Sequence, residues 1–117
     1  MKNLERKVMD ALEQARADER GRYAKVLVSD GPLRQTVLAL KKGRELAEHN
    51  SPPAASLLLF TGRILVTAQD EVEIAAGELV ELTHYRHSVT AVEDSVFLLT
   101  TVTSQPDTGS HDGQPEQ

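Results

Sequence analysis

Histidine is the residue type with the widest chemical capacity in this chain of 117 residues. Three of its four histidines, His49, His84 and His87, lie in the central region. An imidazole exchanges a proton near neutral pH and ligates metals, so these side chains suit a general base, a metal ligand or the polar wall of a pocket. The alternative for each is a structural histidine held by one hydrogen bond, and an exposed loop is the favoured place for His84.

Several other chemistries leave no trace in the sequence. It contains no cysteine, which excludes disulfides, thiolate zinc sites and a cysteine nucleophile. It also lacks a Gly-x-Ser-x-Gly elbow, a phosphate-binding glycine-rich loop and a His-Glu-x-x-His pair. Glu71 and Glu73 lie two residues apart and would share one face of a strand, where a solvated edge explains them more simply than a catalytic pair.

Composition restricts the partners. The chain has 13 Lys and Arg against 18 Asp and Glu, for a net charge of −5, with two Phe, two Tyr and no Trp. Nucleic-acid binding needs a basic surface and stacking aromatic residues, so we expect no nucleic-acid partner. The charged start and the absence of any run near the roughly 20 apolar residues of a membrane span predict no membrane association and a cytoplasmic location.

The first 22 residues predict a helix that packs on the domain behind it. Leu4, Val8, Leu12 and Ala15 recur at helical spacing among charged residues, so an amphipathic helix is expected from residue 3 to about residue 20. Asn3 has the side chain of an N-cap. The apolar stripe is too short for a free-standing coiled coil, which disfavours a helical dimer seam as the alternative.

Residues 23–103 change to short β-rich runs separated by turn residues. Many short strands with no helix between them predict one all-β antiparallel sandwich or barrel and exclude a parallel α/β sheet. Residues 104–117 contain nothing large and apolar to bury and are predicted to form a disordered tail. The expected strands are 23–28, 34–40, 44–49, 56–61, 63–68, 72–75, 79–82, 87–92 and 95–103.

Two segments inside this β-rich region carry a recognisable spacing. Gly43 is followed after five residues by His49, and Gly62 closes the segment. This resembles the first motif of the cupin family, which is a Gly, five residues, His-x-His, three or four residues, a Glu, six residues and a Gly. Gly77 and His87 match the ends of the second cupin motif, although that segment is one residue short and lacks its Pro-rich turn.

The resemblance covers roughly residues 34 to 102, and only 14 residues separate its two segments. It implies a small single-domain cupin: an RmlC-like, jelly-roll β-barrel preceded here by one helix. Cupins that bind metal use both histidines and the Glu of the first motif and the histidine of the second. In this chain Ser51 replaces the second histidine, and Ala55, or Ser56 under the longer spacing, replaces the Glu.

The resemblance implies that His49 and His87, the two motif histidines that this sequence retains, point into the barrel. Two imidazoles alone make a weak metal site, because zinc-like and iron-like centres normally take at least three protein ligands. We therefore expect a small-molecule ligand in a pocket lined by His49, Ser51 and His87, without a strong metal site or other cofactor.

Two other classes of function stay open. One is an enzyme: a dioxygenase or isomerase with a divalent metal such as Fe, Mn, Ni or Zn on His49 and His87, or a metal-free enzyme with one of them as the base. The other is an interaction protein with an unused barrel. Residues 57–60 and 96–99 are apolar on both strand faces, so one face fills the barrel and the other needs the helix or a second subunit. Small cupins commonly pair through such strands, and a homodimer is expected.

Overall fold

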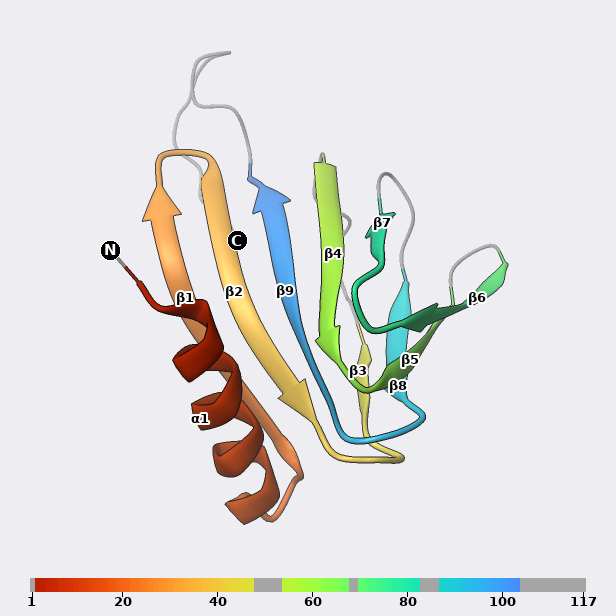
Figure 1. Cartoon of the computed structure of the whole chain (residues 1–117). Helices are drawn as coiled ribbons and strands as arrows, with labels where there is room; N and C mark the ends of the chain where they lie inside the picture. The colour runs from red at the N-terminus through yellow and green to blue at the C-terminus, as the bar shows by residue number, and fades with distance from the viewer. Residues whose placement is uncertain (1, 48–53, 68–69, 83–86, 104–117) are drawn as a thin grey trace.

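The computed structural model describes residues 2–47, 54–67, 70–82 and 87–103. Within these ranges, one helix precedes nine strands (Figure 1). The elements are α1 (Leu4–Ala17), β1 (Arg22–Asp30), β2 (Leu33–Leu40), β3 (Glu45–Ala47), β4 (Ala54–Thr61), β5 (Arg63–Thr67), β6 (Glu71–Ala75), β7 (Leu79–Glu81), β8 (Ser88–Ala91) and β9 (Ser95–Val102). No helix in these ranges is long and apolar enough to cross a membrane.

The helix begins where the sequence predicts and ends earlier. Asn3 is the N-cap, and its side-chain oxygen accepts a hydrogen bond from the backbone N–H three residues on, at 3.0 Å. The predicted end near residue 20 is wrong, because α1 stops at Ala17. The Asp18 carboxylate accepts a bond from the backbone N–H of Arg20 at 2.7 Å, and this Asx turn ends the helix ahead of Gly21.

The helix packs on the outer face of a sheet. Ala11 and Ala15 are fully buried there, and their small side chains let the helix approach the strands closely. The strand residues in this layer include Val37, Ala39 and Val96, from β2 and β9. The helix therefore covers part of the apolar outer face.

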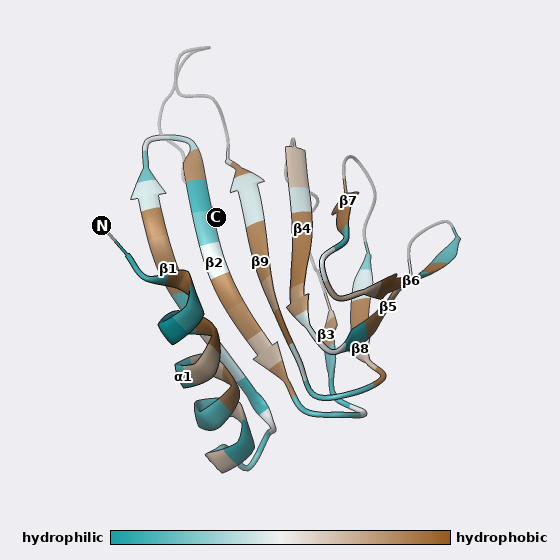
Figure 2. Ribbon diagram, in the orientation of Figure 1, coloured by the Kyte–Doolittle hydropathy of each residue, from teal (hydrophilic) through white to brown (hydrophobic). Residues whose placement is uncertain are grey.

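The strands form two antiparallel sheets, as an all-β barrel of the cupin type requires. The five-stranded sheet has the order β1-β2-β9-β4-β7, and the four-stranded sheet has the order β3-β8-β5-β6. Figure 2 shows hydrophobic segments on strands of both sheets. The core between the sheets holds Leu38, Leu40, Ala55, Leu57, Leu59, Ile64, Val66, Ile74, Leu82, Val89, Ala91 and Phe97.

Strand alternation explains why some runs are apolar throughout. On β2, Leu38 and Leu40 belong to the core between the sheets, whereas Val37 and Ala39 lie under the helix. Because successive side chains of a strand point to opposite faces, the even-numbered residues of β2 face into the barrel. The expectation that one face fills the barrel and the helix covers part of the other is confirmed.

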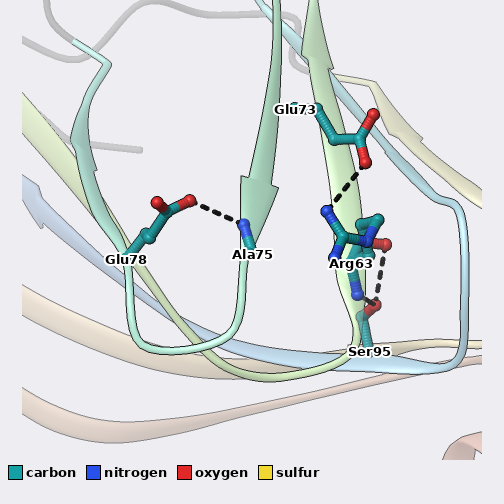
Figure 3. Close-up of polar contacts among 5 residues, drawn as sticks. All are labelled: Arg63, Glu73, Ala75, Glu78 and Ser95. Carbon is teal, nitrogen blue, oxygen red and sulfur yellow. Dashed lines mark hydrogen bonds and ion pairs between the residues drawn. The ribbon is translucent and has the colours of Figure 1, made fainter.

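Polar contacts fix the end of the barrel at which β4 turns into β5 (Figure 3). The buried Ser95 hydroxyl accepts a hydrogen bond from the Arg63 backbone N–H at 3.0 Å and lies 2.7 Å from the Glu93 carbonyl oxygen. The Arg63 guanidinium in turn contacts the Glu73 carboxylate at 2.8 Å. Nearby, the Glu78 carboxylate accepts a bond from the Ala75 N–H at 2.8 Å.

Candidate functional site

The two sheets approach each other at the end just described and separate toward the opposite end (Figure 1). At this opposite end β2 and β4 begin, β9 finishes, and β8 begins. We call this end the barrel mouth and define it by five described residues that line its inward face: Arg34, Ala55, Leu82, His87 and Thr101.

Strand register assembles the side of the mouth formed by the five-stranded sheet. Arg34 on β2 lies opposite Thr101 on β9, and Thr101 lies opposite Ala55 on β4. The Leu82 backbone N–H extends this row by donating to the Ala55 carbonyl at 2.9 Å. Ala55 and Leu82 belong to the core between the sheets, so the whole row faces inward.

Arg34 is the unusual member of this row. Its Nε is buried and has no hydrogen-bond partner. Among the described residues, it is the one buried side-chain nitrogen or oxygen in this position. An unmade hydrogen bond of this kind costs about 1–3 kcal/mol. Arg16, Arg20 and Arg63 pair with carboxylates, whereas the described residues give Arg34 no ion pair. A buried guanidinium donor without a protein acceptor calls for a specific explanation.

His87 belongs to the other side of the mouth. It lies one residue ahead of β8, in the four-stranded sheet, and its side chain is only 6% exposed. Val89, two residues on, packs in the core between the sheets. Alternation along the strand therefore gives His87 the same inward direction as Val89.

Most of the predicted pocket lies outside the described residues. His49 and Ser51 lie outside the described residues, as does His84. Of the predicted trio, His87 alone is described, and it is buried at the barrel mouth.

The donor set inside the barrel does not match that of a metal-binding cupin. Ala55 lies at the position of the motif Glu, and its buried methyl group has no ligating atom. Under the longer spacing the position is Ser56, which pairs with Thr100 and Glu81 on the outward face of the sheet. Within the described ranges, no three His, Asp or Glu side chains cluster as metal ligands would. These residues do not fit the four-ligand centre that the resemblance implies.

Among the described residues, two hollows lie on the outer face of the five-stranded sheet, and the smaller is at the same end of the strands as the barrel mouth. The larger, of about 410 Å³, separates the start of the helix from β1, β2 and β9 and is lined by Lys2, Leu4, Leu27, Val28, Gln35 and Leu98. The smaller, of about 230 Å³, lies along β4, β7 and β9 and includes Ser56, Glu81 and Thr100. Neither contains a histidine or a paired acid and base.

Sequence reasoning identified Arg34 only as the start of a strand. The signal that marks it is the alternation over residues 34–40, in which Arg34 and Thr36 share a face with Leu38 and Leu40. Because Val37 and Ala39 are apolar too, the sequence alone does not say which of the two faces is the inside. The helix contacts on that second face decide the question.

Comparison with solved structures identifies the architecture. The chain is similar to a conserved protein of unknown function from Streptococcus pyogenes, with 26% identity, a TM-score of 0.68, and coverage of 76% of this chain and 80% of that one. It is also similar to a cupin superfamily protein from Desulfitobacterium hafniense, with 13% identity, a TM-score of 0.66, and coverage of 71% and 78%.

A larger enzyme contains the same fold. Salicylate 1,2-dioxygenase from Pseudaminobacter salicylatoxidans matches with 16% identity and a TM-score of 0.72, over 83% of this chain but only 33% of that one. No protein-family model matches the chain, and no curated protein matches it. The shared architecture confirms the fold expected from the glycine and histidine spacing: this chain has the cupin fold.

Proposed function

We propose that this protein binds a small organic molecule at the barrel mouth, without a complete metal centre. The observation that carries the proposal is a pair of polar groups, the buried His87 and the buried Nε of the half-buried Arg34, on inward-facing positions of opposite sheets at the same end of the barrel. The cupin resemblance adds His49 and Ser51 to this proposed pocket.

The surroundings of these groups support a ligand site. Ligand pockets are mostly apolar, with a few polar groups that fix orientation. The inward row next to the mouth supplies apolar surface from the half-buried Leu99 and Val80, and a hydroxyl from Thr36. In this arrangement the apolar rows hold the body of the ligand while His87 and Arg34 hydrogen bond to its polar groups.

A ligand-observed NMR screen of small organic fragments tests the proposal. In such a screen, magnetisation passes from the protein to each fragment that binds it. For fragments that bind the wild-type chain, we expect this transfer to be mostly lost with the His87→Gln variant, because the change removes the imidazole from the mouth. Thr90→Ala is the matched control, since Thr90 lies on β8 but on the outward face. Fragments that bind both variants equally, or a chain that binds none, would overturn the proposal.

A metal-dependent enzyme of the dioxygenase or isomerase class is the second candidate. It is favoured by the two motif histidines that the sequence retains, His49 and His87, and it would use Fe, Mn, Ni or Zn. The missing carboxylate at Ala55 counts against it. Near-stoichiometric metal in untagged protein, lost in both His49→Ala and His87→Ala, would favour this candidate over the metal-free proposal.

We also propose that the protein is a homodimer. The helix packs over β1, β2 and β9, which leaves the outward faces of β4 and β7 without its cover (Figure 1). Leu58 lies opposite Leu79 on this face, and Leu79 is 68% exposed. Light scattering is expected to show a dimer that Leu79→Lys dissociates. Val72→Lys, at an exposed valine on β6, is the control and should leave the dimer intact. A monomeric wild-type chain contradicts the proposal.

A further inference from the structure

The unpaired guanidinium at the barrel mouth narrows the class of ligand. Arg34 lies on the same face of β2 as Leu38 and Leu40, and the residue is half-buried at the barrel mouth. Its Nε is buried and has no acceptor. A buried cationic group is stabilised by a hydrogen-bond acceptor, and a bound ligand could supply that acceptor to Arg34.

The described residues offer no anion in the rows that flank Arg34. Its own inward row contains Ser29, Thr101, Ala55 and Leu82, and the next contains Val26, Thr36, Leu99, Leu57 and Val80. None of these described residues is an Asp or a Glu. The nearest acids along the strands, Asp30 and Glu81, belong to rows on the outward face.

We propose that the ligand carries a carboxylate and that Arg34 binds it. This inference rests on the proposed small-molecule function of the barrel mouth. A guanidinium presents Nε–H and one Nη–H as parallel donors, a geometry that matches the two oxygens of a carboxylate. The Thr101 hydroxyl, directly opposite on β9, is placed to hydrogen bond to the same group.

The single positive charge of Arg34 suits a ligand group with a single negative charge. Arg34 is the one Lys or Arg that the register places on the inward face at the barrel mouth within the described ranges. A monocarboxylate is balanced by it, whereas a phosphate dianion would keep an uncompensated charge among apolar rows. The half-buried apolar neighbours Leu99 and Val80 suit the hydrocarbon part of a small organic acid.

The test follows the Arg34 Nε–H directly by NMR in protein carrying ¹⁵N-arginine. The probes are benzoate and hexanoate, each compared with its uncharged primary amide. Arg34→Lys assigns the Nε–H signal, because that variant lacks it. We expect both acids to move this signal downfield and both amides to leave it unchanged.

Affinity gives the second readout. The charge-assisted pair is expected to make each acid bind at least about tenfold more tightly than its amide. Arg34→Gln should abolish this preference, and Arg6→Gln, which removes an equal charge from the exposed side of the helix, should retain it. Arg34→Lys keeps the charge without the paired donors and should lose part of the preference.

The outcomes separate this inference from the proposed function. Equal binding of acid and amide, with both affinities reduced in His87→Gln, overturns the carboxylate and leaves the small-molecule pocket standing. Acid binding that moves other arginine signals but not that of Arg34 overturns the role of this residue. If neither member of any pair binds, the carboxylate inference falls, and the fragment screen decides the proposed function separately.

Discussion

Arg34 is expected to lower the stability of the empty fold while it serves the proposed binding of a ligand. Its buried Nε lacks an acceptor in the described structure, so the folded chain carries the cost of removing that donor from water. Replacing such a group by an apolar side chain of similar length removes the cost. We predict that Arg34→Met raises the free energy of unfolding by about 1 kcal/mol in urea titrations.

Arg6→Met is the control for this prediction, because Arg6 is exposed on the helix and should change the stability little. A loss of more than about 1 kcal/mol in Arg34→Met would show that the guanidinium stabilises the empty barrel.

A second residue-scale prediction concerns the end of the barrel opposite the mouth. Gly62 has a positive φ of 95°, and a Cβ at this position would collide with the Asp94 carbonyl oxygen and the Ser95 hydroxyl. Gly43 has a similar φ of 86°, but a Cβ there would meet open space. Gly62→Ala should therefore lower the unfolding free energy by about 3 kcal/mol, and Gly43→Ala by only about 1 kcal/mol. Equal losses in urea unfolding would refute this account of Gly62.

At the scale of elements, one carboxylate connects three parts of the chain. Asp94, in the turn before β9, accepts a bond from the Lys42 backbone N–H at 2.8 Å and one from the Arg16 guanidinium of the helix at 3.0 Å. The Lys42 N–H, followed by Arg16, lowers the pKa of Asp94 below its ordinary 3.8. The folded state therefore favours the ionised form.

The sign of the pH effect follows from this lowered pKa. The stabilisation by Asp94 is complete above the unfolded pKa and disappears as the pH falls through the lower, folded value. Asp94→Asn should be less stable than the wild type at pH 7, and the difference should shrink as the pH falls below the ordinary 3.8 and through the lowered pKa of the folded state. Asp10→Asn, on the exposed side of the helix, is the control. If the wild type and Asp94→Asn still differ by the same unfolding free energy at the lowest pH measured, the proposed role of the Asp94 charge is contradicted.

Much of the element structure could be predicted from the sequence, for physical reasons that hold locally. The N-cap at Asn3 and the strand runs follow from side-chain hydrogen bonding and from period-two patterning. The end of the helix could not be predicted from the position of Gly21, because the turn around Asp18 competes with it. The inward direction of Arg34 depends on which face of β2 the helix covers, a contact between distant parts of the chain.

At the scale of the whole molecule, the cupin fold was predicted from glycine and histidine spacing and is confirmed by the sheet topology and the solved structures. The fold itself hosts many chemistries, so function depends on the residues at the mouth. Ala55, where the family motif has a Glu, and the inward-facing Arg34 both favour an organic ligand over a metal.

Thermal melts of untagged protein test this central claim most directly. The melts compare Fe(II), Mn(II), Ni(II) and Zn(II) with small organic molecules, in the wild type and in His87→Gln. A ligand that binds only the folded chain, at 100 times its dissociation constant, adds about 2.7 kcal/mol of stability. The account predicts a shift of this size with an organic ligand, lost in His87→Gln, and none with the metals. A shift of this size with one metal, lost in the same variant, would contradict it.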